Sequence, residues 1–154
     1  MQVSSNFAFL KVHDLQLVRL GSQAERYFAE DPNTCLIKLR QFGELLAQLV
    51  AATVGLYEEK LESQIELLRR LESRGAIGGE TLDLFHELRK SGNLATHSLS
   101  GEQRTALSNL KYARLLGIWF HRSYGGVADF KPSPFVPPID PAQETAALRG
   151  ELAK

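Results

Sequence analysis

Apolar residues recur every three or four positions over most of the chain, from about residue 7 to residue 124. This spacing is typical of amphipathic helices that bury one face. Runs that alternate apolar and polar residues between turn signals, as half-buried strands do, are not found. The pattern therefore predicts an all-α helical bundle.

The apolar pattern divides into one short helical segment followed by about five main helices. We expect these at about residues 7–10, 14–30, 32–54, 61–74, from 82 onward, and 103–124. The segment at 32–54 is apolar around most of its circumference, which favours a central position in the bundle.

Local signals mark several helix ends. Asp31 followed by proline is a strong helix start, because the carboxylate caps free N–H groups and proline needs no donor there. Ser100 and Gln103 have the spacing of a capping box. The Ser-Gly-Asn sequence at residues 91–93 is expected to interrupt or bend its helix.

The composition changes at the C-terminal end. Five of the six prolines lie between Pro132 and Pro141, so this segment is expected to be an extended strap against which Phe135 and Val136 pack back. A connector helix is expected from Asp140 onward. We divide the chain into a helical bundle domain, 1–130, and a strap with the start of a connector, 131–154.

Composition limits the possible functions. The net charge is zero and the pI about 6.9, whereas free-standing nucleic-acid binders are usually basic. Cys35 is expected to be a buried core residue, because a single thiol forms neither a disulfide framework nor a zinc site. No metal site is expected. The chain has no apolar run that could span a membrane and no signal peptide, so a cytoplasmic location is expected.

The most unusual stretch is residues 88–97, which contains Arg89, Lys90, Asn93 and His97. A histidine beside a cation can perform phosphodiester chemistry, with His97 as general acid or base and the cation on the phosphate. The alternative is structural: Gly92 permits close helix packing and the polar residues satisfy a bend.

A second candidate site lies on the last long helix. Arg104, Lys111, Arg114 and Arg122 are spaced by seven, three and eight residues and form one helical stripe. Such a stripe could follow a phosphate backbone, or it could be an ordinary solvated face.

Several blocks, spread over nearly the whole chain, resemble the HEPN-like helical domain at the start of the R (restriction and motor) subunits of type I restriction enzymes. The most recognisable block is residues 31–44. The others are residues 5–10, residues 85–89, the Gly-Asn pair at 92–93, Ala95-x-His97, and the Phe-Val-Pro-Pro sequence at 135–138.

The resemblance implies a non-catalytic accessory module of an ATP- and Mg²⁺-dependent DNA translocase and endonuclease. Its expected task is docking: to other domains of the R subunit, to the methylation and specificity subunits, or to duplex DNA. No cofactor is expected in this segment, because it has no phosphate-binding loop and no motif of the nuclease or motor domains.

The alternative function is a metal-independent HEPN-type ribonuclease of a toxin or defence system that uses His97. In such enzymes an arginine precedes the histidine with four to six residues between them, and here Gly92 occupies a place where the arginine often stands. Arg89 is too distant and Lys90 lacks the bidentate guanidinium, which argues against catalysis. A self-associating homodimer is a third, weaker expectation.

Overall fold

The computed structural model describes residues 6–58, 62–97 and 102–138. Within them the chain folds into one short 3-10 helix and five α-helices, and no strand is present in this part of the chain. The elements are η1 (Ala8–Val12), α1 (Leu15–Tyr27), α2 (Pro32–Thr53), α3 (Gln64–Ser73), α4 (Gly79–His97) and α5 (Gln103–Ser123). The predicted all-α bundle is confirmed.

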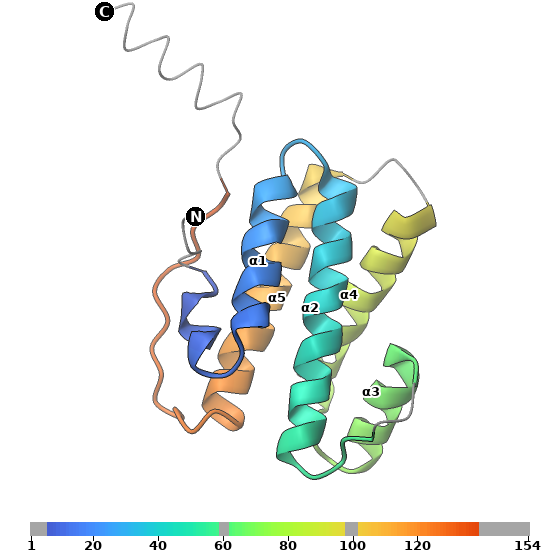
Figure 1. Cartoon of the computed structure of the whole chain (residues 1–154), viewed down its shortest axis with the longest axis vertical. Helices are drawn as coiled ribbons and strands as arrows, with labels where there is room; N and C mark the ends of the chain where they lie inside the picture. Colours follow the sequence, from blue (N-terminus) through green and yellow to red (C-terminus); the bar gives the residue numbers. More distant parts are fainter. Residues whose placement is uncertain (1–5, 59–61, 98–101, 139–154) are drawn as a thin grey trace, which may run out of the picture.

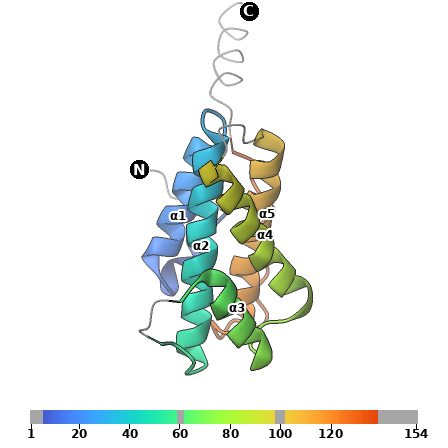
Figure 2. The same cartoon turned by 90° about the vertical axis from the view of Figure 1, so that its right-hand side faces the viewer.

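The four long helices form two layers. Helices α1 and α2 lie side by side in one layer, and α4 and α5 lie behind them (Figures 1 and 2). Helix α2 contacts all the other α-helices, which confirms the central position that its apolar sequence predicted. The short helix α3 packs across the lower ends of α2 and α4 (Figure 2).

Side-chain caps begin three of the helices. Asp14 accepts a hydrogen bond from the backbone N–H of Gln16, and Ser63 accepts one from Glu66. Asp31 accepts from the backbone N–H of Thr34 at 3.1 Å, as the Asp-Pro pair predicted. Ser100 lies outside the described residues; α5 begins after Glu102, whose side chain makes no capping bond.

The core lies between the two layers and extends under η1. Phe7, Phe42 and Phe85 are fully buried, and the rings of Phe7 and Phe42 meet edge-on with centroids 5.3 Å apart. Burial of such large rings is among the strongest stabilising contributions in a small domain. Cys35 is also fully buried, as expected, and burial raises the pKa of its thiol to about 12.

The expected interruption at residues 91–93 is wrong, because α4 continues through them to His97. Gly92 is buried at the crossing of α4 with α2, where a Cβ atom would lie 2.4 Å from the Cβ of Arg40. The glycine therefore allows two helices to approach closely and does not break either one.

After α5 the chain turns back along the bundle as a strap, residues 127–138. The strap runs beside η1 and the outer side of α5, toward the point where the described chain begins (Figure 1). Phe135 packs against the core, as predicted, whereas the side chain of Val136 is half-exposed. The expected connector helix lies outside the described residues. No helix in the described part of the chain is both long and apolar enough to cross a membrane.

Candidate functional site

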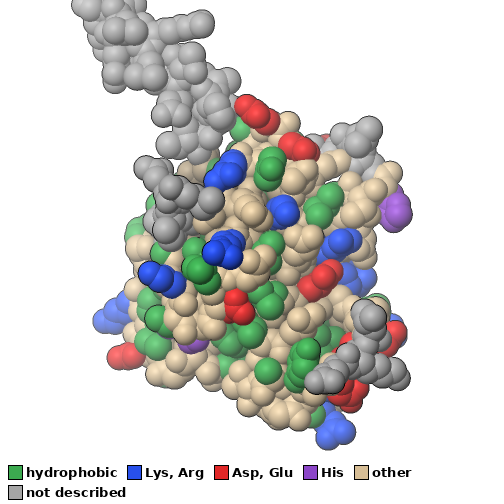
Figure 3. Space-filling view, viewed as in Figure 1, with side chains coloured by type: hydrophobic (Ala, Val, Ile, Leu, Met, Phe, Trp, Pro, Cys, Tyr) green, Lys and Arg blue, Asp and Glu red, His purple; other side chains and the backbone are tan. Residues whose placement is uncertain are grey.

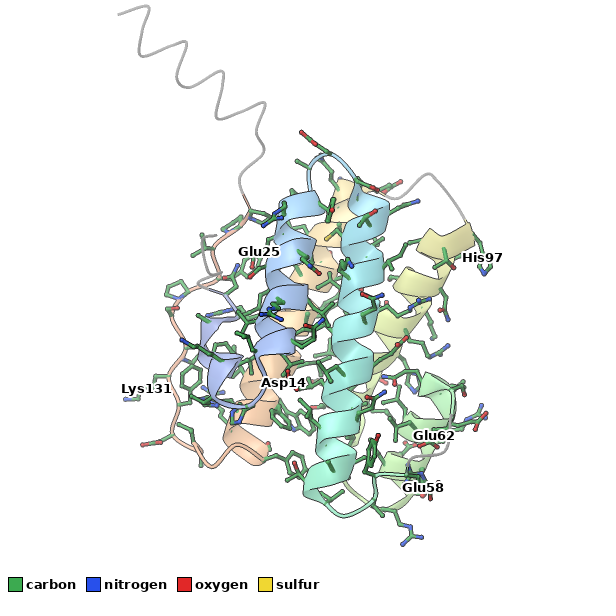
Figure 4. All side chains as sticks on the ribbon, viewed as in Figure 1. Asp14, Glu25, Glu58, Glu62, His97 and Lys131 are labelled. Carbon is green, nitrogen blue, oxygen red and sulfur yellow. The ribbon has the colours of Figure 1, made fainter. Side chains whose placement is uncertain are left out.

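The candidate site predicted at residues 88–97 lies on α4. Among its exposed side chains are Lys90, Asn93, Leu94 and His97, and we call these four the α4 surface. The spacings of three and four residues place these side chains on one side of the helix, and all four are exposed. His97 lies at the end of α4 and its ring points away from the bundle (Figure 4).

Leu94 is the member of this surface that sequence reasoning missed. Its side chain is 69% exposed in the middle of a polar helix face. The sequence did contain a sign that Leu94 is exposed. Leu94 is two positions from the buried Gly92 and therefore falls outside the apolar stripe of α4. Leu94 gives the α4 surface an apolar centre, which is common where one protein contacts another.

Two of the predicted catalytic residues are engaged elsewhere. The Arg89 Nε donates a hydrogen bond to His86 Nδ1 at 3.3 Å, and burial together with Arg89 lowers the pKa of His86. The Asn93 Oδ1 accepts from Arg40 Nη1 of α2 at 3.2 Å. Asn93 therefore helps to join α2 and α4 beside Gly92.

The structure does not bring Arg89 and His97 together. They are eight positions apart, or about 12 Å along the helix axis, and Arg89 is directed to His86. His97 makes no hydrogen bond or ion pair with any residue of the described ranges. This arrangement favours a binding surface over a paired acid–base site.

The four cations predicted as one stripe on α5 divide into two kinds. Arg104 is exposed and has no hydrogen bond or ion pair among the described residues. The exposed Lys111 Nζ lies 5.9 Å from the centroid of the Phe135 ring in the strap, within the range of a cation–π contact. The other two cations, Arg114 and Arg122, bind the strap directly.

Arg114 is only 7% exposed, so its guanidinium is removed from solvent. Its Nε donates to the carbonyl of Asn6 at 3.3 Å and its Nη2 donates to the carbonyl of Ser133. Burial lowers the pKa of Arg114, because a charged group loses hydration there. Arg114 thus joins the N-terminal segment, α5 and the strap.

Two further groups complete this attachment. Arg122 donates from Nε and Nη2 to the carbonyl of Phe130 at 2.9 and 2.7 Å. The Asn6 side chain donates to the carbonyl of Val136 at 2.7 Å and accepts from its N–H at 2.8 Å. We call Asn6, Arg114 and Arg122 the strap clamp.

A histidine pair lies beside the first residues of the strap. The distance between His13 Nε2 and His121 Nδ1 is 2.7 Å, a hydrogen bond that requires one of the two nitrogens to be unprotonated. The His121 ring also contacts Phe130 of the strap, with centroids 4.6 Å apart. Burial lowers the pKa of both histidines, and for His13 the nearby His121 adds to this effect.

An open pocket of about 370 Å³ lies outside both predicted sites, between α2, α3 and the loop that joins them. Arg70 is its main cation, and it donates to the carbonyl of Leu56 and to Glu62 Oε1. The hydrogen bond with Glu62 raises the pKa of Arg70. Because protein groups already occupy this guanidinium, the pocket offers little free positive charge to an anionic ligand.

Among the described residues, the face seen in Figure 3 shows no concentrated charge. Basic side chains are scattered over the face that α1 and α2 present to the viewer (Figure 3). In the described ranges, no three His, Cys, Asp or Glu side chains are placed to hold a metal ion.

Comparisons with known proteins find one curated relative and one domain family. The chain is 34% identical over 139 residues to the type I restriction enzyme EcoKI endonuclease subunit of Escherichia coli (strain K12). This match covers 90% of the chain but 12% of that subunit. No solved structure matches the chain. The model of the domain of unknown function DUF4145 matches residues 22–114, more than half of the sequence, and the chain therefore belongs to the DUF4145 family.

Proposed function

We propose that this chain is the N-terminal accessory domain of the R subunit of a type I restriction enzyme, with a HEPN-like bundle. The observation that carries the proposal is the 34% identity to such a subunit over 90% of the chain. The matched region is a small part of that subunit, which suits one appended helical domain. On this proposal, ATP- and Mg²⁺-dependent translocation and DNA cleavage belong to other parts of the enzyme.

The proposed task of the domain is docking, and the α4 surface is the proposed contact. It combines an exposed leucine with Lys90, Asn93 and His97, and an apolar centre surrounded by polar groups is typical of protein–protein contacts. The proposed partners are the methylation and specificity subunits of the same restriction complex, or the neighbouring domains of the R subunit.

The test compares two exposed leucines on different helices. Purified Leu94→Asp and Leu115→Asp variants are titrated against the methylation–specificity complex by calorimetry. Leu115 is 53% exposed on α5, which makes it a matched control for Leu94. We expect Leu94→Asp to weaken binding at least about tenfold, because a charge would be desolvated at the contact, and Leu115→Asp to change it less than about twofold.

Equal loss in both variants would exclude the α4 surface as the contact. If the wild-type domain does not bind the complex, docking to these subunits would be refuted.

Contact with duplex DNA is the second form of the docking proposal. The support for it is limited to Arg104 and Lys111, because Arg114 is buried and Arg122 binds the strap. Binding to labelled duplex across a salt series, with Arg104→Glu/Lys111→Glu beside the wild type, tests it. Binding that falls steeply with salt and disappears in the variant would support DNA contact. Absence of binding by the folded wild type would exclude it.

The ribonuclease alternative has less support. Its single favourable observation is that His97 is exposed and has no partner among the described residues. The expected result is that RNA remains intact after incubation with the pure chain. Cleavage that Asn93→Ala retains and His97→Ala abolishes would instead establish catalysis by His97.

A further inference from the structure

The strap clamp recognises backbone carbonyls at a regular interval. Arg122, Arg114 and Asn6 donate to the carbonyls of Phe130, Ser133 and Val136, which are each three residues apart. In a polyproline II helix every third carbonyl points in the same direction, because the helix has three residues per turn. The contacts therefore have the periodicity of this conformation.

The composition of the strap agrees with this geometry. Residues 130–138 contain four prolines and have neither helix nor strand structure. A polyproline II segment forms no internal hydrogen bonds, so its carbonyls are available to external donors. Prolines also reduce the freedom of the unbound segment, which lowers the entropic cost of binding it.

Few side chains of the strap take part in its contacts with the bundle. Lys131 points away from the bundle (Figure 4), and Ser133 is bound through its carbonyl. Two aromatic side chains make the specific contacts: Phe130 with Phe9 and His121, and Phe135 with Lys111. The strap clamp and its neighbours thus contact an extended backbone and two aromatic rings that are five residues apart.

We propose that the surface formed by Asn6, Arg114, Arg122 and the neighbouring Phe9 is a binding site for an extended, proline-rich peptide. In this structure the strap occupies the site as a ligand supplied by the same chain. Asn6, η1 and α5 form a receptor that does not need the covalent link after α5.

The test separates the strap from the bundle after folding. A specific protease site is inserted between Gly126 and Val127 in the full chain, since Gly126 is exposed and follows the end of α5. The protein is folded and purified, cleaved, and examined by native mass spectrometry and circular dichroism. A labelled peptide of residues 127–138 then competes with the cleaved fragment.

We expect the cleaved fragment to remain bound, and the labelled peptide to exchange with it while the helical signal is retained. Arg122→Ala should lower the peptide affinity at least about tenfold, because two charge-assisted hydrogen bonds are lost. The matched control Arg104→Ala, on the same helix, should change it less than about twofold. A peptide with alanine in place of Lys131 and Ser133 should also bind within about twofold of the original.

Two outcomes would overturn the proposal. In the first, the fragment dissociates from a helical bundle that then fails to bind the peptide. In the second, the helices unfold when the fragment leaves, which would make the strap part of the core and not a ligand. Because the readout is peptide binding alone, it is independent of the proposed role in a restriction complex.

Discussion

Replacing Gly92 with alanine is expected to force helices α2 and α4 apart. The new Cβ would lie 2.4 Å from the Arg40 Cβ and 3.0 Å from its Cγ and Cδ. The Arg40 Cβ is attached directly to the backbone of α2, so the overlap can be relieved only by moving a helix. Overpacking of this kind costs about 1–3 kcal/mol.

The intrinsic helix propensity acts in the opposite direction. Alanine is favoured over glycine inside a helix by about 1 kcal/mol. Because the overlap exceeds 1 Å compared with an ordinary carbon–carbon contact of about 3.5–4.0 Å, we place its cost at the upper end of the range. The expected net result is a loss of about 1–2 kcal/mol in the free energy of unfolding.

The assay is urea denaturation followed by circular dichroism, with Gly78→Ala as the control. A Cβ at Gly78 would have no atom within 4 Å, so this variant should stay within about 0.5 kcal/mol of the wild type. In double variants, Arg40→Gly should remove more of the Gly92→Ala defect than Arg40→Ala does, because only glycine removes the Cβ.

The reasoning would be refuted if Gly92→Ala were as stable as the wild type. It would also be refuted if Arg40→Ala relieved the defect as fully as Arg40→Gly.

Three further predictions concern Arg114, the His13–His121 pair and Cys35. Arg114→Ala should lower the free energy of unfolding by about 2–3 kcal/mol, because two carbonyls lose their donor. The control Arg104→Ala should change it by less than about 0.5 kcal/mol. Equal effects of the two variants in urea denaturation would contradict a stabilising role of Arg114 in the strap clamp. His13 and His121 have pKa values below the unfolded value of 6.5, so the unfolded state binds more protons, and stability should be full above pH 6.5 and fall as the pH drops below it. A double glutamine variant should show a weaker pH dependence than the wild type, and an unchanged dependence would exclude the pair as a source. Cys35, with a pKa raised to about 12, should resist iodoacetamide at pH 8 in the folded chain and react in urea; rapid labelling of the folded chain would contradict its burial.

The helices could be predicted because their signals are local. The Asp31-Pro32 start depends on a cap that lies within one turn, and the apolar spacing of α2 is read directly from its own residues. The error at Gly92 has a non-local cause. A glycine inside a helix has the same local sequence signal whether it breaks the helix or admits a neighbour, and only the position of Arg40 on α2 distinguishes the two.

The candidate surfaces were harder to predict for the same reason. Arg114 and Arg104 both belong to the helical stripe that the sequence shows. Arg114 is nevertheless buried under the strap, about 20 residues further along the chain, whereas Arg104 is exposed. His13 gave no recognisable signal, because its partner His121 is 108 positions away. Local periodicity identifies which face a residue occupies, but not which distant backbone segment covers it.

The hydrogen bonds between Asn6 and Val136 have a mechanical consequence. They join two positions 130 residues apart, so the described chain is closed into a loop that contains every helix. Tension applied to the chain outside this loop would act first on the bonds that Asn6 makes with Val136 and with Arg114 of α5, before it loads the other helices. The Asn6 side chain would then set the force at which the strap detaches from the bundle. Single-molecule pulling on the Asn6→Ala variant should show this detachment at a lower force than in the wild type.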